Sequence, residues 1–203
     1  KEFSYLYLDS GALYRAVTLY AMENGMISAN GDIDVPALIS KLPELDIHFE
    51  YTPEGSHTYI GDRCVDSLIR TIEVSSHVSP ISVLPEVRNF VDRKLVEYGK
   101  NKRIVMDGRD IGTSVFPNAD LKIFMTADDN VRAERRLKEM QASGKAPDFE
   151  AVLKNLKERD YIDSHRETSP LRKADDAIVL DNSNMTMDDQ MVWIRGLISD
   201  KFK

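Results

Sequence analysis

Residues 104–117 read Ile-Val-Met-Asp-Gly-Arg-Asp-Ile-Gly-Thr-Ser-Val-Phe-Pro. The short apolar run at the start predicts a buried strand, which delivers a carboxylate, a glycine, an arginine and a second carboxylate into a turn. In open α/β sheets, ligands bind at the carboxyl ends of the strands. Arg109 offers a rigid fork for a phosphate, and Asp107 and Asp110 can accept hydrogen bonds from a base or a ribose or hold a metal-bound water. Taken alone, the segment is explained equally well as a polar turn after a buried strand.

Short apolar runs and helical patterns alternate along the rest of the chain. The expected strands lie at 4–8, 103–107, 121–125 and 177–180, and the expected helices at 12–24, 34–42, 71–79, 85–99, 129–142, 149–163 and 186–202. Pro80 and Pro85 are expected to punctuate the helices, and 144–147 is expected to be a loop. This order predicts an α/β fold, in which a parallel sheet carries helices on both faces.

Residues 46–51, 57–60 and 63–65 form a different pattern. They alternate or are rich in β-branched residues, and turn residues join them, which predicts a small antiparallel meander. Because the neighbouring segments are helical, we expect this meander to be an inserted lobe rather than part of the parallel core.

The composition restricts the classes of protein. The chain has 203 residues, of which 42% are hydrophobic and 30% charged, and its net charge is −7. These values are typical of a globular domain, and the acidic balance argues against a nucleic-acid partner. No apolar run approaches the roughly 18 residues that span a membrane, so we expect no membrane partner. The single cysteine, Cys64, and the absence of a recognisable signal peptide favour a cytoplasmic location.

Cysteine and histidine give no sign of a metal site. Cys64 is expected to be a small, buried or half-buried apolar residue. The four histidines lack the spacing of metal ligands, so the sequence predicts no protein metal site. They are His48, His57, His77 and His165.

A second candidate anion site is the segment Asp9-Ser10-Gly11-Ala12-Leu13-Tyr14-Arg15, which follows an expected strand and opens a helix. A helix N-terminus presents free N–H groups and a positive dipole, and Arg15 lies within about one turn of it. The alternative is simple N-capping by Asp9 or Ser10 beside a solvated arginine.

Arg159, Asp163 and Arg166 lie at i, i+4 and i+7 of an expected helix, and therefore on one face. This row can be a surface ion-pair ladder or a mobile gate that closes cations onto phosphates. Other arginines recur beside turns, helix starts and strand ends. Convergent arginines suit phosphoryl transfer, whose catalysis is mostly positioning and charge stabilisation. The recurring positions are Arg15, Arg70, Arg88, Arg109, Arg135, Arg136, Arg159 and Arg166.

Four ordered motifs together resemble the bacterial cytidylate kinases, from Tyr5 to about Asn182. They are Asp9 to Arg15, Ile69-Arg70-Thr71-Ile72-Glu73-Val74-Ser75, Asp107-Gly108-Arg109-Asp110-Ile111-Gly112-Thr113 with Val115-Phe116-Pro117, and Lys157-Glu158-Arg159-Asp160. The resemblance implies one kinase domain of the P-loop type. Its core would comprise 1–33, 80–130 and 170–203, its monophosphate-binding insert lobe about 34–79, and its helical lid about 131–169.

The family transfers the γ-phosphoryl group of Mg-ATP to CMP or dCMP, which gives CDP or dCDP. The resemblance therefore implies Mg²⁺ with ATP as co-substrate, CMP or dCMP as acceptor, and a monomeric protein. It implies catalytic roles for Arg15, Arg109, Arg159 and Arg166. The implied CMP-binding residues are Asp9, Ser10, Arg15, Arg70, Ser79, Arg88, Arg109, Asp110, Arg159 and Asp163. The implied ATP-binding residues are Arg135 and Arg136.

One motif of the family has no match in this sequence. The family begins with a strand and the loop Gly-x-x-x-x-Gly-Lys-[Ser/Thr], which cradles the ATP phosphates. We expect that loop and its central strand to precede residue 1. Two alternatives are a kinase of broader UMP/CMP specificity and a catalytically inactive nucleotide-binding domain that lacks the loop. A purely structural α/β domain fits the clustered arginines least.

Overall fold

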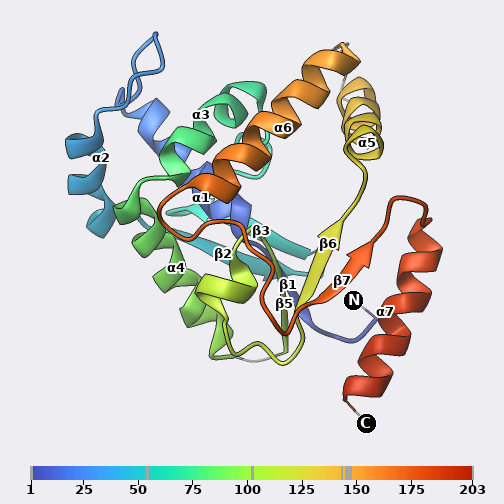
Figure 1. The fold of residues 1–203 in the computed structure, drawn as a ribbon. Helices are drawn as coiled ribbons and strands as arrows, with labels where there is room; N and C mark the ends of the chain where they lie inside the picture. Colours follow the sequence, from blue (N-terminus) through green and yellow to red (C-terminus); the bar gives the residue numbers. More distant parts are fainter. Residues whose placement is uncertain (1, 54, 102, 143, 145–147, 203) are drawn as a thin grey trace. The chain divides into compact units, whose positions relative to one another are not determined.

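The computed structural model describes residues 2–53, 55–101, 103–142, 144 and 148–202 (Figure 1). The chain divides into two compact units, residues 1–111 and residues 112–203. Both units combine helices with parallel strands, as the sequence predicts. None of the helices in the described part has the length and the apolar character to cross a membrane.

The N-terminal unit is built around the parallel pair β1 (Leu6–Asp9) and β5 (Ile104–Asp107). The register places Leu6 opposite Ile104 and Asp9 opposite Asp107, so both strands end at the same edge. Helix α1 (Ser10–Glu23) begins directly after β1, because the Asp9 carboxylate accepts a hydrogen bond from the Ala12 N–H and caps the helix.

Three further helices complete this unit: α2 (Val35–Lys41), α3 (Ile72–Ser82) and α4 (Pro85–Gly99). A 3₁₀ turn, Leu42–Glu44, follows α2. Apolar side chains, many of them from β1 and the helices, form a fully buried core. The removal of this apolar surface from water is the main contribution to the stability of such a unit. Core residues of this unit with no more than 1% exposure include Leu8, Leu13, Ala16, Val17, Ala21, Leu38, Ile47, Val65, Ile69, Val74, Ile81, Val87, Val91 and Leu95.

The prediction that Pro80 ends a helix is wrong. Helix α3 continues through Pro80 to Ser82, whereas Pro85 does begin α4. Proline lacks an N–H group and removes one hydrogen bond of a helix. Burial of Val74, Val78 and Ile81 along one face of α3 offsets that loss.

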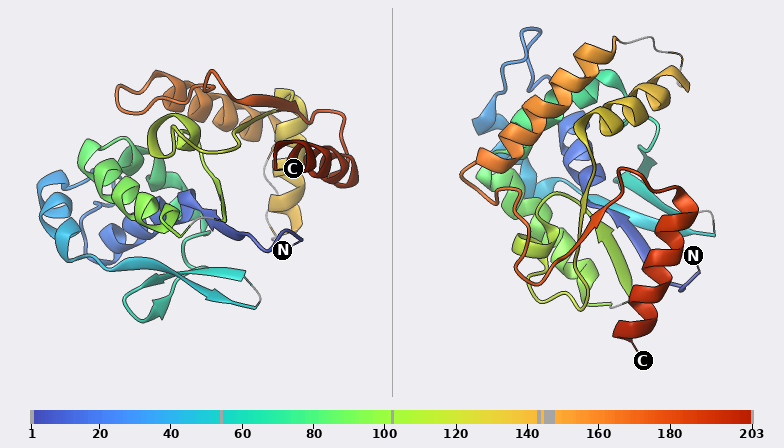
Figure 2. Two further views of the ribbon diagram at one scale, coloured as in Figure 1. Left: turned by 90° about the horizontal axis from the view of Figure 1, so that it is seen from below. Right: turned by 45° about the vertical axis from the view of Figure 1, so that its right-hand side comes forward.

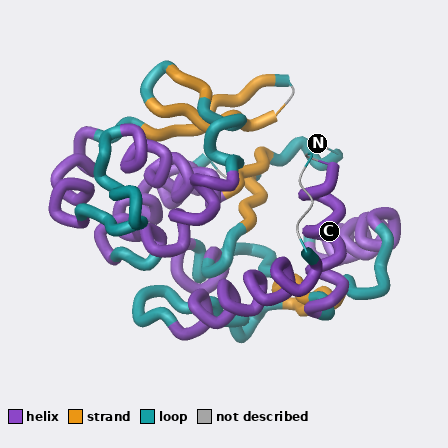
Figure 3. The backbone as a smooth tube through the Cα atoms, turned by 90° about the horizontal axis from the view of Figure 1, so that it is seen from above, coloured by secondary structure: helices purple, strands orange, loops and turns teal. Residues whose placement is uncertain are grey.

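The predicted antiparallel meander is confirmed as β2 (Ile47–Thr52), β3 (Gly55–Ile60) and β4 (Arg63–Cys64), in the order β2-β3-β4. Figure 3 shows these strands as a group separate from β1 and β5. The expectation that Cys64 is buried or half-buried is wrong, since its side chain is exposed. Cys64 lies on an edge strand of two residues, and alternate residues of a strand point to opposite faces.

Within the N-terminal unit, one face of the parallel pair is covered by helices. Leu8 is fully buried against the core, but Tyr7 and its cross-strand partner Val105 are 52% and 50% exposed. Because neighbouring residues of a strand alternate between faces, the α1 side of this pair is covered and the other side is open within the unit.

The C-terminal unit contains the parallel pair β6 (Ile123–Thr126) and β7 (Ile178–Asp181) with α5 (Asp129–Ala142), α6 (Phe149–His165) and α7 (Met187–Lys201). Helices α5 and α6 lie side by side (Figures 1 and 2), and the Arg132 guanidinium joins them by donating to both carboxylate oxygens of Asp160. The loop expected at 144–147 lies outside the described residues except for Gly144.

We predict that Gly108→Ala destabilises the N-terminal unit. A Cβ at this position would lie 2.3 Å from Ser10 Oγ and 2.6 Å from Ile111 Cγ1, so these side chains or the backbone must move. Such overpacking typically lowers the free energy of unfolding by about 1–3 kcal/mol. Urea denaturation measures the change.

Gly196→Ala is the matched control, because a Cβ in the middle of α7 meets no atom within 4 Å. Alanine favours a helix interior over glycine by roughly 0.5–1 kcal/mol, so this variant should be slightly more stable. Equal urea midpoints for Gly108→Ala and the unmodified protein would show that the turn tolerates a side chain.

Candidate functional site

Three of the residues predicted for the phosphate site lie near the start of α1. They are Asp9, Arg15 and Arg70. The Arg15 guanidinium donates to Ser75 Oγ at 2.8 Å and to the Ile69 carbonyl at 3.4 Å. Arg70 Nη2 lies 3.2 Å from Asp9 Oδ2, the carboxylate that also caps α1. Two guanidinium groups are thus held near the N-terminus of a helix, which itself favours anions.

The carboxyl ends of β1 and β5 are joined by a side-chain hydrogen bond. Ser10, which is 4% exposed, donates from Oγ to the Asp107 carbonyl oxygen at 2.7 Å. Desolvation raises the pKa of Asp107, and the Asp9 carboxylate opposite raises it further. Two acidic groups therefore share this strand edge, and a cation would be attracted to it.

A buried ion pair between Arg88 and Asp110 is the second part of the site. The two residues are 1% and 5% exposed, and Arg88 Nη2 donates to Asp110 Oδ2. Arg88 Nη1 also donates to the Ser82 carbonyl at 3.1 Å. Burial opposes the charged form of Arg88, but the neighbouring Tyr14 and Asp110 outweigh it, so the pKa of Arg88 is raised.

Tyr14 supports the Arg88 guanidinium, a role that was not predicted from the sequence. Its ring centroid lies 5.4 Å from Arg88 Cζ, within the range of a cation–π contact. Its hydroxyl donates to Asp92 Oδ1 at 3.3 Å, and burial raises the pKa of that hydroxyl. Arg88 Nε is buried and has no hydrogen-bond partner among the residues that the structure describes. A water or a bound group would satisfy such a donor.

Ser79 and Arg109 are the two other predicted residues near the buried pair in sequence. Arg109 directly precedes Asp110, and Ser79 lies on α3, the helix before the one that carries Arg88. Ser79 is half-buried on α3, and its carbonyl accepts a hydrogen bond from Ser82 Oγ at 3.0 Å. Since the Ser82 carbonyl accepts from Arg88, residue 82 links the backbone of Ser79 to the buried guanidinium. Arg109 is half-buried in the turn between Gly108 and Asp110.

The remaining predicted residues belong to the C-terminal unit. On α5, Arg135 donates to the side chain and the carbonyl of Asn182, at 2.9 and 2.7 Å, and Arg136 pairs with Glu139 at 3.1 Å. Arg159 and Asp163 lie on α6, and Asp163 is 8% exposed.

Two of the three charged residues predicted to form a row on α6, Asp163 and Arg166, make an ion pair. Arg166 caps the end of α6, and its Nη1 lies 3.3 Å from Asp163 Oδ1 while its Nε donates to the Ser169 carbonyl at 2.8 Å. The pair is largely buried and therefore differs from a surface ladder, and whether the row closes onto a phosphate stays a prediction. Arg159 is half-buried on the same helix.

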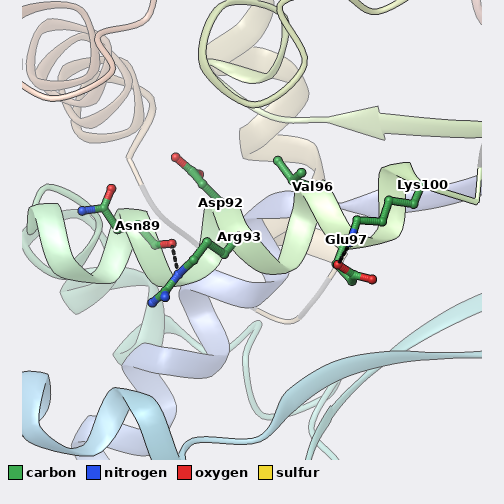
Figure 4. Close-up of a pocket in the computed structure, with 6 residues that line it drawn as sticks. All are labelled: Asn89, Asp92, Arg93, Val96, Glu97 and Lys100. Carbon is green, nitrogen blue, oxygen red and sulfur yellow. Dashed lines mark hydrogen bonds and ion pairs between the residues drawn. The ribbon is translucent and has the colours of Figure 1, made fainter.

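A shallow pocket along α4 contains none of the predicted residues (Figure 4). Arg93 Nε donates to the Asn89 carbonyl at 3.1 Å, and Lys100 pairs with Glu97, so these cations are engaged within their own helix. The pocket therefore adds nothing to the arginine-rich site. Its lining residues are Asn89, Asp92, Arg93, Val96, Glu97 and Lys100.

Comparison with known proteins supports the motif analysis. A family model described as Cytidylate kinase matches residues 1–197. A cytidylate kinase of Bacteroides thetaiotaomicron is 52% identical over 197 residues, which cover 96% of this chain and 85% of the relative. A cytidylate kinase of Flavobacterium johnsoniae is 48% identical over 205 residues, which cover 100% of this chain and 89% of the relative.

We predict that Arg88→Met lowers the free energy of unfolding by about 3–5 kcal/mol, because it leaves the Asp110 carboxylate buried without the guanidinium. Arg88→Met combined with Asp110→Leu should recover most of the loss, since no charge then remains buried. Urea denaturation of both single variants and the double variant gives the coupling energy. Additive effects would mean that the two side chains do not act as a pair.

Proposed function

Because the chain belongs to the cytidylate kinase family, we propose that the arginine-rich site of its N-terminal unit holds the acceptor nucleotide of the family's reaction. The protein is a nucleoside monophosphate kinase that transfers a phosphoryl group from ATP to CMP. The observation that carries the assignment of the acceptor site is the buried Arg88–Asp110 pair with its unpartnered Nε.

Arg15, Arg70 and Arg109 are proposed to bind the phosphate of CMP. The support is that Ser75 and Asp9 already orient the first two guanidinium groups beside the N-terminus of α1. A guanidinium held in place loses little side-chain entropy when it binds phosphate, and its fork matches two phosphate oxygens. In the reaction, Arg15 and Arg109 would stabilise the negative charge of the acceptor phosphate as it approaches the donor.

Arg88, Asp110 and Ser79 are proposed to read cytosine. The exocyclic amine of cytosine is a donor, and a carboxylate such as Asp110 accepts from it. The guanidinium of Arg88 can donate to the acceptor atoms of the same ring edge. Uracil presents a carbonyl in place of the amine and would leave the carboxylate facing another acceptor, so UMP is rejected through unpaired buried groups. None of these contacts involves the 2′-hydroxyl, which is consistent with acceptance of dCMP.

Mg²⁺ is proposed to enter with ATP as part of the co-substrate. The acidic edge formed by Asp9 and Asp107 fits a divalent cation, because Mg²⁺ prefers carboxylates, phosphate oxygens and water. When bound, the ion neutralises charge on the phosphates. The roles that the resemblance gives to Arg135, Arg136, Arg159, Asp163 and Arg166 stay predictions, as do the monomeric state and the cytoplasmic location.

The test is to express the protein from its complete gene and to follow ADP formation from Mg-ATP with CMP, dCMP, UMP or AMP. We expect turnover with CMP and dCMP well above that with UMP and AMP. Comparable turnover with UMP would favour a kinase of broader specificity. No turnover with any acceptor would favour an inactive nucleotide-binding domain.

Asp110→Ala should lower the ratio of kcat/KM for CMP to that for UMP by roughly 10- to 100-fold, as expected when a hydrogen bond to a charged group is lost. Ser79→Ala should lower the same ratio by a smaller factor. Because this variant leaves the buried ion pair intact, its effect is not confused with a folding defect. Asp120→Ala removes an exposed aspartate of the other unit and serves as the control. An unchanged ratio in Asp110→Ala would remove Asp110 from the cytosine site.

A further inference from the structure

One face of the antiparallel sheet β2-β3-β4 brings together side chains that bind metals. Tyr59 pairs with Cys64 across β3 and β4, and alternate residues of a strand share a face. His57 and Cys64 therefore lie on one face with Asp66, the second residue after Cys64. One ligand atom from each of these three residues lies within 4.8 Å of the other two. The opposite face is buried and carries Ile47, Phe49, Thr58 and Val65.

We propose that His57, Cys64 and Asp66 bind one divalent transition-metal ion, for which Zn²⁺ is the best match. A thiolate, an imidazole and a carboxylate are the ligand types that Zn²⁺ takes in proteins. Mg²⁺ prefers oxygen ligands throughout, so this site is distinct in chemistry from any Mg²⁺ that accompanies ATP. Three protein ligands leave the fourth tetrahedral position to water. The thiolate and the carboxylate balance the charge of the ion.

Neighbouring groups already orient two of the three ligands. His57 Nδ1 lies 2.9 Å from Asp66 Oδ2, and His57 Nε2 lies 3.0 Å from Thr52 Oγ1. A proton on Nε2 directed at Thr52 would leave Nδ1 to the metal, and hydrogen bonding of the second ring nitrogen is typical of metal-bound histidines. The other carboxylate oxygen, Asp66 Oδ1, accepts from the Thr58 N–H at 2.9 Å.

The site is open to solvent and separate from the proposed kinase site. The side chains of His57 and Asp66 are about one-third exposed and Cys64 is exposed, so an ion can enter directly. An ion here would tie β3 to β4 and to Asp66, the second residue after β4. Strand β4 has only two residues, and the ion would strengthen this short edge. None of the three residues has a role in the phosphoryl transfer described above.

The proposed metal site differs from the sequence-based expectation that the chain has none. The sequence spacing between His57 and Cys64 is not that of a zinc motif. The ladder between β3 and β4, rather than the spacing, brings the ligands together. A metal site on a β-ladder is therefore missed by any search for short motifs.

The test is a titration of the reduced, chelator-treated full-length protein with Co²⁺, followed by absorption spectroscopy. Tetrahedral Co²⁺ with a thiolate ligand gives a sulfur-to-cobalt charge-transfer band in the near ultraviolet and ligand-field bands in the visible. We expect both at one equivalent, and we expect Zn²⁺ to bleach them. Residues 1–203 contain a single cysteine, and loss of the charge-transfer band in Cys64→Ser assigns the band to Cys64.

Variants decide whether these three residues are the ligands. Cys64→Ser should abolish the charge-transfer band, and His57→Gln and Asp66→Asn should each weaken Zn²⁺ binding by roughly tenfold or more. His77→Gln, on α3, is the matched control and should bind as the unmodified protein does. Zn²⁺ should raise the melting temperature of the unmodified protein but not that of Cys64→Ser.

The proposal is overturned if the unmodified protein gives no charge-transfer band or if Cys64→Ser binds Zn²⁺ as tightly. Circular dichroism of each variant confirms folding, so a lost signal is not confused with a misfolded chain. All readouts are independent of phosphoryl transfer. A failure of this proposal therefore leaves the kinase assignment unaffected, and the reverse also holds.

Discussion

The parallel pairing of β1 with β5 is the constraint on which the proposed acceptor site depends. It sets Asp9 opposite Asp107, so the turn that opens α1 and the turn that contains Arg109 and Asp110 leave the sheet at one edge. The hydrogen bond from Ser10 to the Asp107 carbonyl ties the two turns together. A shift of one residue would send these side chains to the opposite face and separate the groups that the chemistry needs.

Most of the elements could be predicted from the sequence, because periodicity and turn residues act locally. Helix α4 begins at Pro85 as expected, and α5 has the expected bounds. The failures have non-local causes. Pro80 lies inside α3 because burial of one helix face outweighs a lost hydrogen bond, and Cys64 is exposed because it lies on a short edge strand. Neither is visible in a window of neighbouring residues.

The candidate site was predictable in its residue types and less so in its contacts. The sequence and its resemblance identify Arg15, Arg88 and Asp110 as residues of interest, but they do not reveal that Arg88 and Asp110 are a buried pair. The cation–π contact from Tyr14 joins α1 to α4 and requires the packing of two helices. The grouping of His57 with Cys64 depends on strand register. Side chains that meet only through tertiary structure leave little trace in the spacing of a sequence.

The burial of Arg88 with Asp110 has a consequence for how this family can change over evolutionary time. A single replacement at either position leaves a charge without its counterpart in a site that excludes water. An intermediate of that kind loses stability before any new base preference can be selected. A change at the proposed cytosine site therefore requires two substitutions that arise together, or a prior stabilising change elsewhere.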